Sequence, residues 1–236
     1  MKIEICENYE EMSRRAAEIF QKEIKENPKC VLGLATGSTP VGMYEKLCTM
    51  GLDFSGVKTV NLDEYYPISP ENENSYRYFM NENLFSKVNI DKKNTHVPNG
   101  AAKNPDEECE KYDEMIENLG GIDLQVLGIG ANGHIGFNEP GAELVAKTHV
   151  TALTESTIKA NARFFDDISS VPTHALTMGM ASILGARKIV LLVSGKQKHD
   201  ALKALEDDKI TTAIPATFLK LHPNVTVICD RDAYIG

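Results

Sequence analysis

The chain has 236 residues, of which 42% are hydrophobic and 25% charged, values that are ordinary for a folded globular protein. Its formal net charge of −9 disfavours sequence-independent binding to nucleic acid or to an anionic membrane surface. No apolar run approaches the roughly 18 residues of a membrane helix, and the charged N-terminus is unlike a signal peptide. We therefore expect a cytoplasmic protein with no nucleic-acid or membrane partner.

The five cysteines are scattered along the chain and form no Cys-x-x-Cys pair, so a disulfide framework or a zinc knuckle is not expected. The spacing of the histidines also lacks a metal-binding pattern such as His-x-x-x-His. The sequence therefore predicts no metal site and fits a reducing compartment.

Short β-branched runs alternate with helical patterns along the chain. Strands are expected at residues 2–5, 30–34, 57–62, 95–97, 122–127, 188–193 and 225–229, with an extended segment at 149–153. Helices are expected at residues 9–25, 39–50, 75–85, 105–119, 155–165, 173–184 and 196–205, with Thr39 as the cap and Pro40 at the first position of the second. This alternation predicts one α/β domain, residues 1–236, with a doubly wound, mostly parallel sheet and helices on both faces.

Two of the expected strand-to-helix turns have the composition of an anion site. Gly37, Ser38 and Thr39 place backbone N–H groups and hydroxyls at a helix N-terminus, and the turn at Ser194 adds cations that include Lys198. Each could equally be a plain turn or a solvated helix start. Neither is a Walker loop or a Gly-x-Gly-x-x-Gly motif, so nucleotide binding is not supported.

Acid–base residues follow two other strands. The glycine-rich segment 128–140 contains His134 and Glu139, and Asp63 follows the strand at 57–62. Each alone is compatible with a glycine turn or a solvated loop charge. Because a doubly wound sheet brings the carboxyl ends of its strands to one edge, we expect these residues to meet the anion-binding turns. Together they indicate proton-transfer chemistry on a phosphorylated metabolite.

Four segments resemble the glucosamine-6-phosphate deaminase family. They are Leu-Gly-Leu-Ala-Thr-Gly-Ser-Thr-Pro (32–40), Asn-Leu-Asp-Glu-Tyr (61–65), Gly-Ile-Gly-Ala-Asn-Gly-His-Ile-Gly-Phe-Asn-Glu-Pro (128–140) and Asn-Ala-Arg-Phe-Phe (161–165). The resemblance is collinear over essentially the whole chain. It implies conversion of D-glucosamine 6-phosphate and water to D-fructose 6-phosphate and ammonia without a cofactor. It also implies the fold shared with ribose-5-phosphate isomerase and CoA transferases.

The resemblance assigns roles to individual residues. Asp63 matches the base that moves a proton between C2 and C1, His134 the residue that assists ring opening, and Glu139 its acidic partner. The matches to the phosphate site are Gly37, Ser38, Thr39, Arg163 and Lys198. On residue pattern alone, Arg163 is more typical of a solvated cationic helix face.

One position in the catalytic segment departs from the family pattern. Many members carry an aspartate two residues before the histidine, where this chain has Asn132. An asparagine carbonyl can orient an imidazole N–H but supplies no charge to stabilise imidazolium. We therefore include Asn132 in the site and expect an altered proton relay.

The resemblance also bears on assembly. Allosteric members bind N-acetylglucosamine 6-phosphate through small hydroxyl and basic residues just beyond the Glu-Pro block, where this chain has Ala142, His149 and Thr151. The chain also ends at Gly236 without the longer C-terminal region of those enzymes. These differences predict a monomer or low-order homo-oligomer without activation by that sugar phosphate.

The sequence leaves two alternative functions to consider. A 6-phosphogluconolactonase-like hydrolase would share the fold, but lactonases typically carry Asp-Glu-Arg where this chain has Asp63-Glu64-Tyr65. A catalytically silent sugar-phosphate sensor would need only the phosphate loop, so the presence of Asp63, His134 and Glu139 argues against it.

Overall fold

A parallel seven-stranded sheet forms the middle layer of the protein. The computed structural model describes residues 1–154, 158 and 171–236. The strand order of the sheet is β1 (Lys2–Cys6), β10 (Val225–Asp230), β9 (Ile189–Val193), β6 (Leu124–Gly128), β2 (Val31–Leu34), β3 (Lys58–Asn61) and β5 (Thr95–His96). All six ladders are parallel, so the predicted α/β class and mostly parallel sheet are confirmed.

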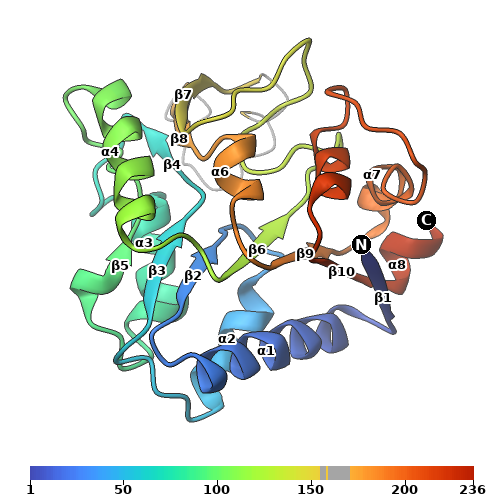
Figure 1. Cartoon of the computed structure of the whole chain (residues 1–236), viewed down its shortest axis with the longest axis horizontal. Coiled ribbons are helices and arrows are strands. Elements are labelled where there is room, and N and C mark those ends of the chain that lie inside the picture. The colour runs from blue at the N-terminus through green and yellow to red at the C-terminus, as the bar shows by residue number, and fades with distance from the viewer. Residues whose placement is uncertain (155–157, 159–170) are drawn as a thin grey trace.

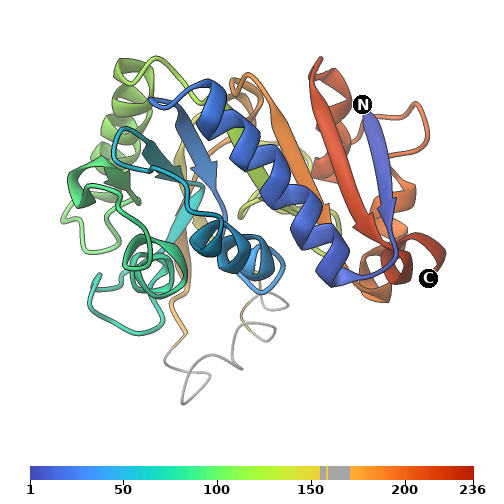
Figure 2. The same cartoon turned by 90° about the horizontal axis from the view of Figure 1, so that it is seen from below.

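Helices cover both faces of this sheet. Helices α1 (Tyr9–Glu26) and α2 (Val41–Thr49) lie over one face, whereas α4 (Pro105–Asn118) and α6 (Met180–Leu184) lie on the other side (Figures 1 and 2). The start of α1 is capped by Asn8, whose side chain accepts from the Glu11 N–H. One face of α1 is apolar and buried, with Met12, Ala16 and Phe20 fully enclosed.

A second, antiparallel sheet that the sequence pattern did not predict lies on the side of α4 and α6. Its strands are β4 (Asp63–Tyr66), β8 (His174–Thr177) and β7 (His149–Ala152). The prediction of a helix over 173–184 was therefore wrong, because its first half is β8 and only Met180–Leu184 is helical. A short buried apolar run such as 175–178 does not distinguish strand from helix by its periodicity.

The chain passes from the large sheet to the small sheet at Leu62. Its N–H donates to the Leu34 carbonyl at the end of β2, and its carbonyl accepts from the Met178 N–H just after β8. Leu62 is therefore bonded to both sheets, and the next residue, Asp63, begins β4. This switch fixes Asp63 beside the carboxyl ends of the central strands.

The other predictions differ from the structure mainly at element ends. Helix α2 begins at Val41 after Pro40, with no side-chain cap, so the cap assigned to Thr39 was wrong. Segment 75–85 is helical as α3 (Tyr76–Met80) and the π-helix η1 (Asn81–Phe85), and segment 196–205 contains η5 (Lys196–Lys198) and α7 (His199–Lys203). The short helices η2 (Lys92–Asn94), η6 (Pro215–Leu221) and α8 (Arg231–Ile235) were not expected. The helix expected at 155–165 falls almost wholly outside the described residues.

Candidate functional site

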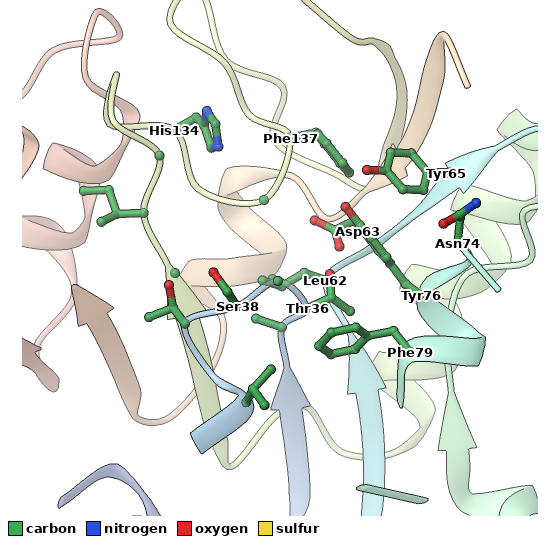
Figure 3. A pocket seen from close by; sticks show the side chains of 18 of the residues that line it. Thr36, Ser38, Leu62, Asp63, Tyr65, Asn74, Tyr76, Phe79, His134 and Phe137 are labelled. Carbon is green, nitrogen blue, oxygen red and sulfur yellow. The ribbon is translucent and has the colours of Figure 1, made fainter. Parts of the chain in front are cut away.

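A cavity of about 710 Å³ opens where the carboxyl ends of β2, β3, β6 and β9 meet. Gly37, Ser38, Thr39, Asp63, Asn132, His134 and Lys198 all line it. Figure 3 shows Asp63 and His134 approaching this space from separate elements, with Thr36 and Ser38 below them. The structure therefore brings together the predicted acid–base residues and most of the predicted anion site, as the position of the strand ends requires.

Two tyrosines hold the loop between β2 and α2 in place. The buried Tyr44 hydroxyl donates to the Ala35 carbonyl at 2.6 Å and accepts from the Ala35 N–H at 3.2 Å. On the other side of the loop, the Tyr9 hydroxyl donates to the Ser38 carbonyl at 3.0 Å and accepts from the Gly42 N–H at 2.9 Å. The loop and the N-terminus of α2 are thereby preorganised at the cavity wall, an arrangement suited to binding an anion.

Asp230 fastens the turn that carries Lys198. Its buried carboxylate lies at the end of β10 and accepts from the Ser194 hydroxyl and from the Gly195 N–H at 3.1 Å. It also caps α8 by accepting from the Ala233 N–H at 2.8 Å. Lys198, three residues beyond Gly195, is thus placed at the cavity by a carboxylate from a different strand.

Asp63 is the buried acid of the cavity. Only 7% of its surface is exposed. Burial, followed by the negative charge of neighbouring Glu64, raises the pKa of Asp63 to about 8. A carboxyl group with a pKa near the working pH is well suited to accept and return a proton.

His134, Asn132 and Glu139 form a hydrogen-bonded group on the loop that follows β6. Its Nδ1 lies 3.2 Å from Oε2 of Glu139, and the Asn132 amide donates to the same oxygen at 2.7 Å. The Asn132 carbonyl accepts from the backbone N–H of His134 at 3.2 Å, so Asn132 orients the loop and not the ring, contrary to expectation. Glu139 is therefore the acid that orients the imidazole.

A close backbone contact brings the His134 loop against Asp63. Gly136 has φ +57°, and an added Cβ would lie 2.9 Å from Oγ1 of Thr177 and 3.5 Å from Oδ2 of Asp63. Thr177 pairs with Asp63 across the β4–β8 ladder, and its hydroxyl accepts from the Phe137 N–H at 3.1 Å. Only glycine permits both this conformation and this approach.

An aromatic wall, formed by Tyr65, Tyr76 and Phe137, was missed by sequence reasoning. Tyr76 stacks on Phe137 with ring centroids 6.2 Å apart, and Tyr65 lies 4.7 Å from Tyr76. All three side chains line the cavity beside Asp63 (Figure 3). Their grouping depends on contacts between distant segments. The only sequence signal is that Tyr65 and Phe137 lie inside the two segments already singled out.

Replacing Asn132 by aspartate should move the acid limb of the pH–rate profile to higher pH. The variant removes the N–H that donates to Glu139 and brings a second carboxylate to about the same 2.7 Å distance. Two carboxylates this close favour retention of a proton. Profiles of wild type and Asn132→Asp, measured over the same buffers, provide the test. An unmoved acid limb would show that residue 132 does not affect the group whose ionisation limits the rate.

Some predicted features cannot be placed in this cavity. Arg163 lies outside the described residues, and Glu139 contacts His134 without lining the cavity. Within residues 1–154, 158 and 171–236, no group of three or more His, Cys, Asp or Glu side chains is arranged to hold a metal ion. No helix in that same part of the chain is both long and apolar enough to cross a membrane.

Comparisons with known proteins agree with this geometry. The model of a family described as glucosamine-6-phosphate isomerases/6-phosphogluconolactonase matches residues 7–228. A glucosamine-6-phosphate deaminase from Thermoanaerobacter pseudethanolicus is 57% identical over 237 residues, which cover 99% of this chain and 94% of that protein. A solved structure of a monomeric glucosamine-6-phosphate deaminase is 47% identical with a TM-score of 0.96, covering 99% and 98% of the two chains. A Thermotoga maritima 6-phosphogluconolactonase, 23% identical with a TM-score of 0.78 over 97% and 98%, shares the fold.

Proposed function

Because the chain belongs to the family of glucosamine-6-phosphate isomerases and 6-phosphogluconolactonases, we propose that it is a glucosamine-6-phosphate deaminase. It converts D-glucosamine 6-phosphate and water to D-fructose 6-phosphate and ammonia, a hydrolytic and isomerising deamination in cytoplasmic amino-sugar catabolism. The observation that carries the proposal is one cavity lined by an anion-ready loop, a buried carboxylate and an imidazole. The 57% identity to a deaminase over nearly the whole chain supports the same substrate.

In this proposal the phosphate anchors the substrate away from the reacting carbons. Gly37, Ser38, Thr39 and Lys198, which line the cavity, bind it. The resemblance also assigns Arg163 to phosphate binding, and that residue lies outside the described part of the chain. Binding energy from this remote group positions C1 and C2 against the acid–base residues. No organic cofactor or metal is needed, since each step moves protons.

Ring opening falls to His134. An ionised Glu139 accepts from Nδ1–H, which leaves the lone pair of Nε2 free to take the proton of the anomeric hydroxyl. The same proton, delivered to the ring oxygen, breaks the C1–O bond and gives the open-chain aldehyde. Asn132 holds both the backbone of His134 and Glu139 in position during this transfer.

Isomerisation then falls to Asp63. Its carboxylate removes the proton from C2 and returns it to C1, while the oxygen on C1 gains the proton that the 2-ammonium group loses. This leaves a protonated imine at C2, which water hydrolyses to the ketone and ammonia. The protonated 2-amino group of the bound substrate favours the charged form of the carboxylate, and so opposes the burial that raises the pKa of Asp63. A buried acid with a raised pKa is therefore suited to a cationic substrate.

Ammonia release from glucosamine 6-phosphate, coupled to formation of fructose 6-phosphate, tests the proposal directly. The rival lactonase activity rests on a fold-level likeness alone. Purified protein should release ammonia and should leave 6-phosphogluconolactone at its spontaneous rate of hydrolysis. Lactone hydrolysis without ammonia release would replace the proposal with its alternative.

The Lys198→Ala variant should bind glucosamine 6-phosphate more weakly. Loss of a charge-assisted hydrogen bond costs about 1.5–3 kcal/mol, or roughly 10- to 100-fold in KM. Lys196→Ala is the matched control, because Lys196 belongs to the same short helix but does not line the cavity. Steady-state kinetics of both variants provide the measurement. Equal effects of the two substitutions would argue against phosphate binding by Lys198.

The proposal extends to assembly. One solved relative is described as monomeric, and we infer that this chain likewise acts as a monomer or a low-order homo-oligomer. Light scattering during size-exclusion chromatography, together with saturation curves measured with and without N-acetylglucosamine 6-phosphate, tests this inference. A large oligomer with sigmoidal kinetics that become hyperbolic with the effector would contradict it.

A further inference from the structure

Glu64 is a second buried acid, adjacent to Asp63 but with different partners. Only 1% of its surface is exposed. Its Oε1 accepts from the backbone N–H groups of Tyr65 at 2.9 Å and Tyr76 at 2.8 Å, and its Oε2 accepts from the Arg77 N–H at 2.9 Å. The carboxylate therefore ties strand β4 to the first turn of α3.

This contact completes the capping of α3. The Ser75 hydroxyl accepts from the Tyr78 N–H at 3.0 Å, so Ser75 and Glu64 together satisfy the first three N–H groups of the helix. Tyr76 belongs to the aromatic wall of the cavity. The same carboxylate thus connects the strand that begins with Asp63 to the helix that carries Tyr76, whose ring lies beside Asp63 (Figure 3).

We propose that Glu64 is a positioning residue for the reaction: it fixes the distance between Asp63 and the Tyr76 wall and keeps a negative charge beside Asp63. This inference rests on the proposed deaminase function. Burial raises the pKa of Glu64 to about 7, although the three N–H groups that donate to its carboxylate favour the charged form and lower the pKa. Once charged, Glu64 opposes ionisation of Asp63, so that Asp63 holds its proton until the cationic substrate arrives.

The negative charge that raises the pKa of Asp63 comes from Glu64, and the other groups described around the two acids supply none. Arg77 of α3 faces Glu64, but its guanidinium donates to the hydroxyl and carbonyl of Thr95 at 2.9 Å each. Tyr76 of α3 and Tyr112 of α4 face Asp63, and burial raises the pKa of both phenols, so they stay neutral. Thr177 of the paired strand β8 carries no charge.

Glu64→Gln and Glu64→Asp separate charge from geometry. Glutamine keeps the side-chain length, and its carbonyl oxygen can still accept from backbone N–H groups, but it removes the charge and one of the two acceptor oxygens. Because the charge is lost, the acid limb of kcat/KM should move to lower pH by about one unit. Aspartate keeps the charge but is too short for all three hydrogen bonds. It should therefore displace Asp63 and Tyr76 from their positions and lower kcat by about tenfold or more. The acid limb of kcat/KM should shift less than in Glu64→Gln. Glu71→Gln, in an exposed position of the segment between β4 and α3, is the control for net charge and should match wild type.

A titration without substrate keeps this test independent of the proposed activity. The carboxyl signal of Asp63 in ¹³C-aspartate-labelled protein, assigned with Asp63→Asn, should titrate about one unit lower in Glu64→Gln than in wild type. An unchanged titration midpoint and an unchanged acid limb would overturn the role of Glu64. A shifted midpoint in a protein that releases no ammonia would retain the coupling of the two acids while refuting the deaminase function.

Discussion

Asp63→Asn should lower turnover of glucosamine 6-phosphate by about two to four orders of magnitude while leaving substrate binding nearly unchanged. Asparagine preserves the shape of the buried side chain but cannot take the proton from C2. Gly37, Ser38, Thr39 and Lys198, which we propose bind the phosphate, lie on other elements of the cavity, so KM should stay within a few-fold of wild type. Single-turnover rates and equilibrium binding of the substrate provide the measurements. Near-normal turnover would show that another group is the base.

The wild-type pH profile carries a second signature of Asp63. Because burial raises the pKa of Asp63 to about 8, kcat/KM should increase as pH rises through that value. The raised pKa also means that the folded protein keeps a proton that the unfolded chain releases near 3.8. The free energy of unfolding should therefore fall as pH rises from about 4 to about 8. Asp63→Asn should show less of this fall, which denaturation at several pH values can measure.

The sequence predicted the large sheet well because its strands are local apolar runs. Every residue of β9 (Ile189–Val193) is buried, as expected for a strand of a parallel sheet covered on both faces. The polar residues that follow such strands must then lie together at one edge of the sheet, however the rest of the chain is folded. For this reason the sequence alone predicts that Ser38, Asp63 and His134 share one site.

The small sheet could not be predicted in this way. Strand β4 reads Asp-Glu-Tyr-Tyr, which has no apolar alternation, and it is a strand because it pairs with the distant β8. Acidic residues are usually solvated, so burial of both Asp63 and Glu64 runs against the general pattern. The partners of Glu64 are backbone N–H groups, which leave no trace in side-chain identity. Sequence patterns are therefore least informative where the fold buries acidic groups whose ionisation is unfavourable.

Gly130→Ala should reduce kcat by about a hundredfold although it replaces no titratable group. An alanine Cβ at this position would lie 2.4 Å from Cε1 and 2.5 Å from Nδ1 of His134, far inside van der Waals contact. The imidazole must then swing away, which breaks its contact with Glu139 at 3.2 Å. A displacement of about 1 Å at a catalytic group costs on the order of 10² in rate. KM should change little, because the loop that we propose binds the phosphate follows a different strand, β2.

Gly128→Ala, at the last residue of β6 two positions before Gly130, is the matched control. A Cβ there has no heavy atom within 4 Å, so the methyl group can be added without moving His134. The two variants should unfold at similar temperatures, whereas only Gly130→Ala should lose turnover and shift the imidazole NMR signals of His134. If Gly130→Ala shifted those signals yet kept wild-type kcat, ring opening would not depend on the position of this histidine. If both variants lost activity equally, space in the cavity, and not the imidazole, would limit the reaction at this loop.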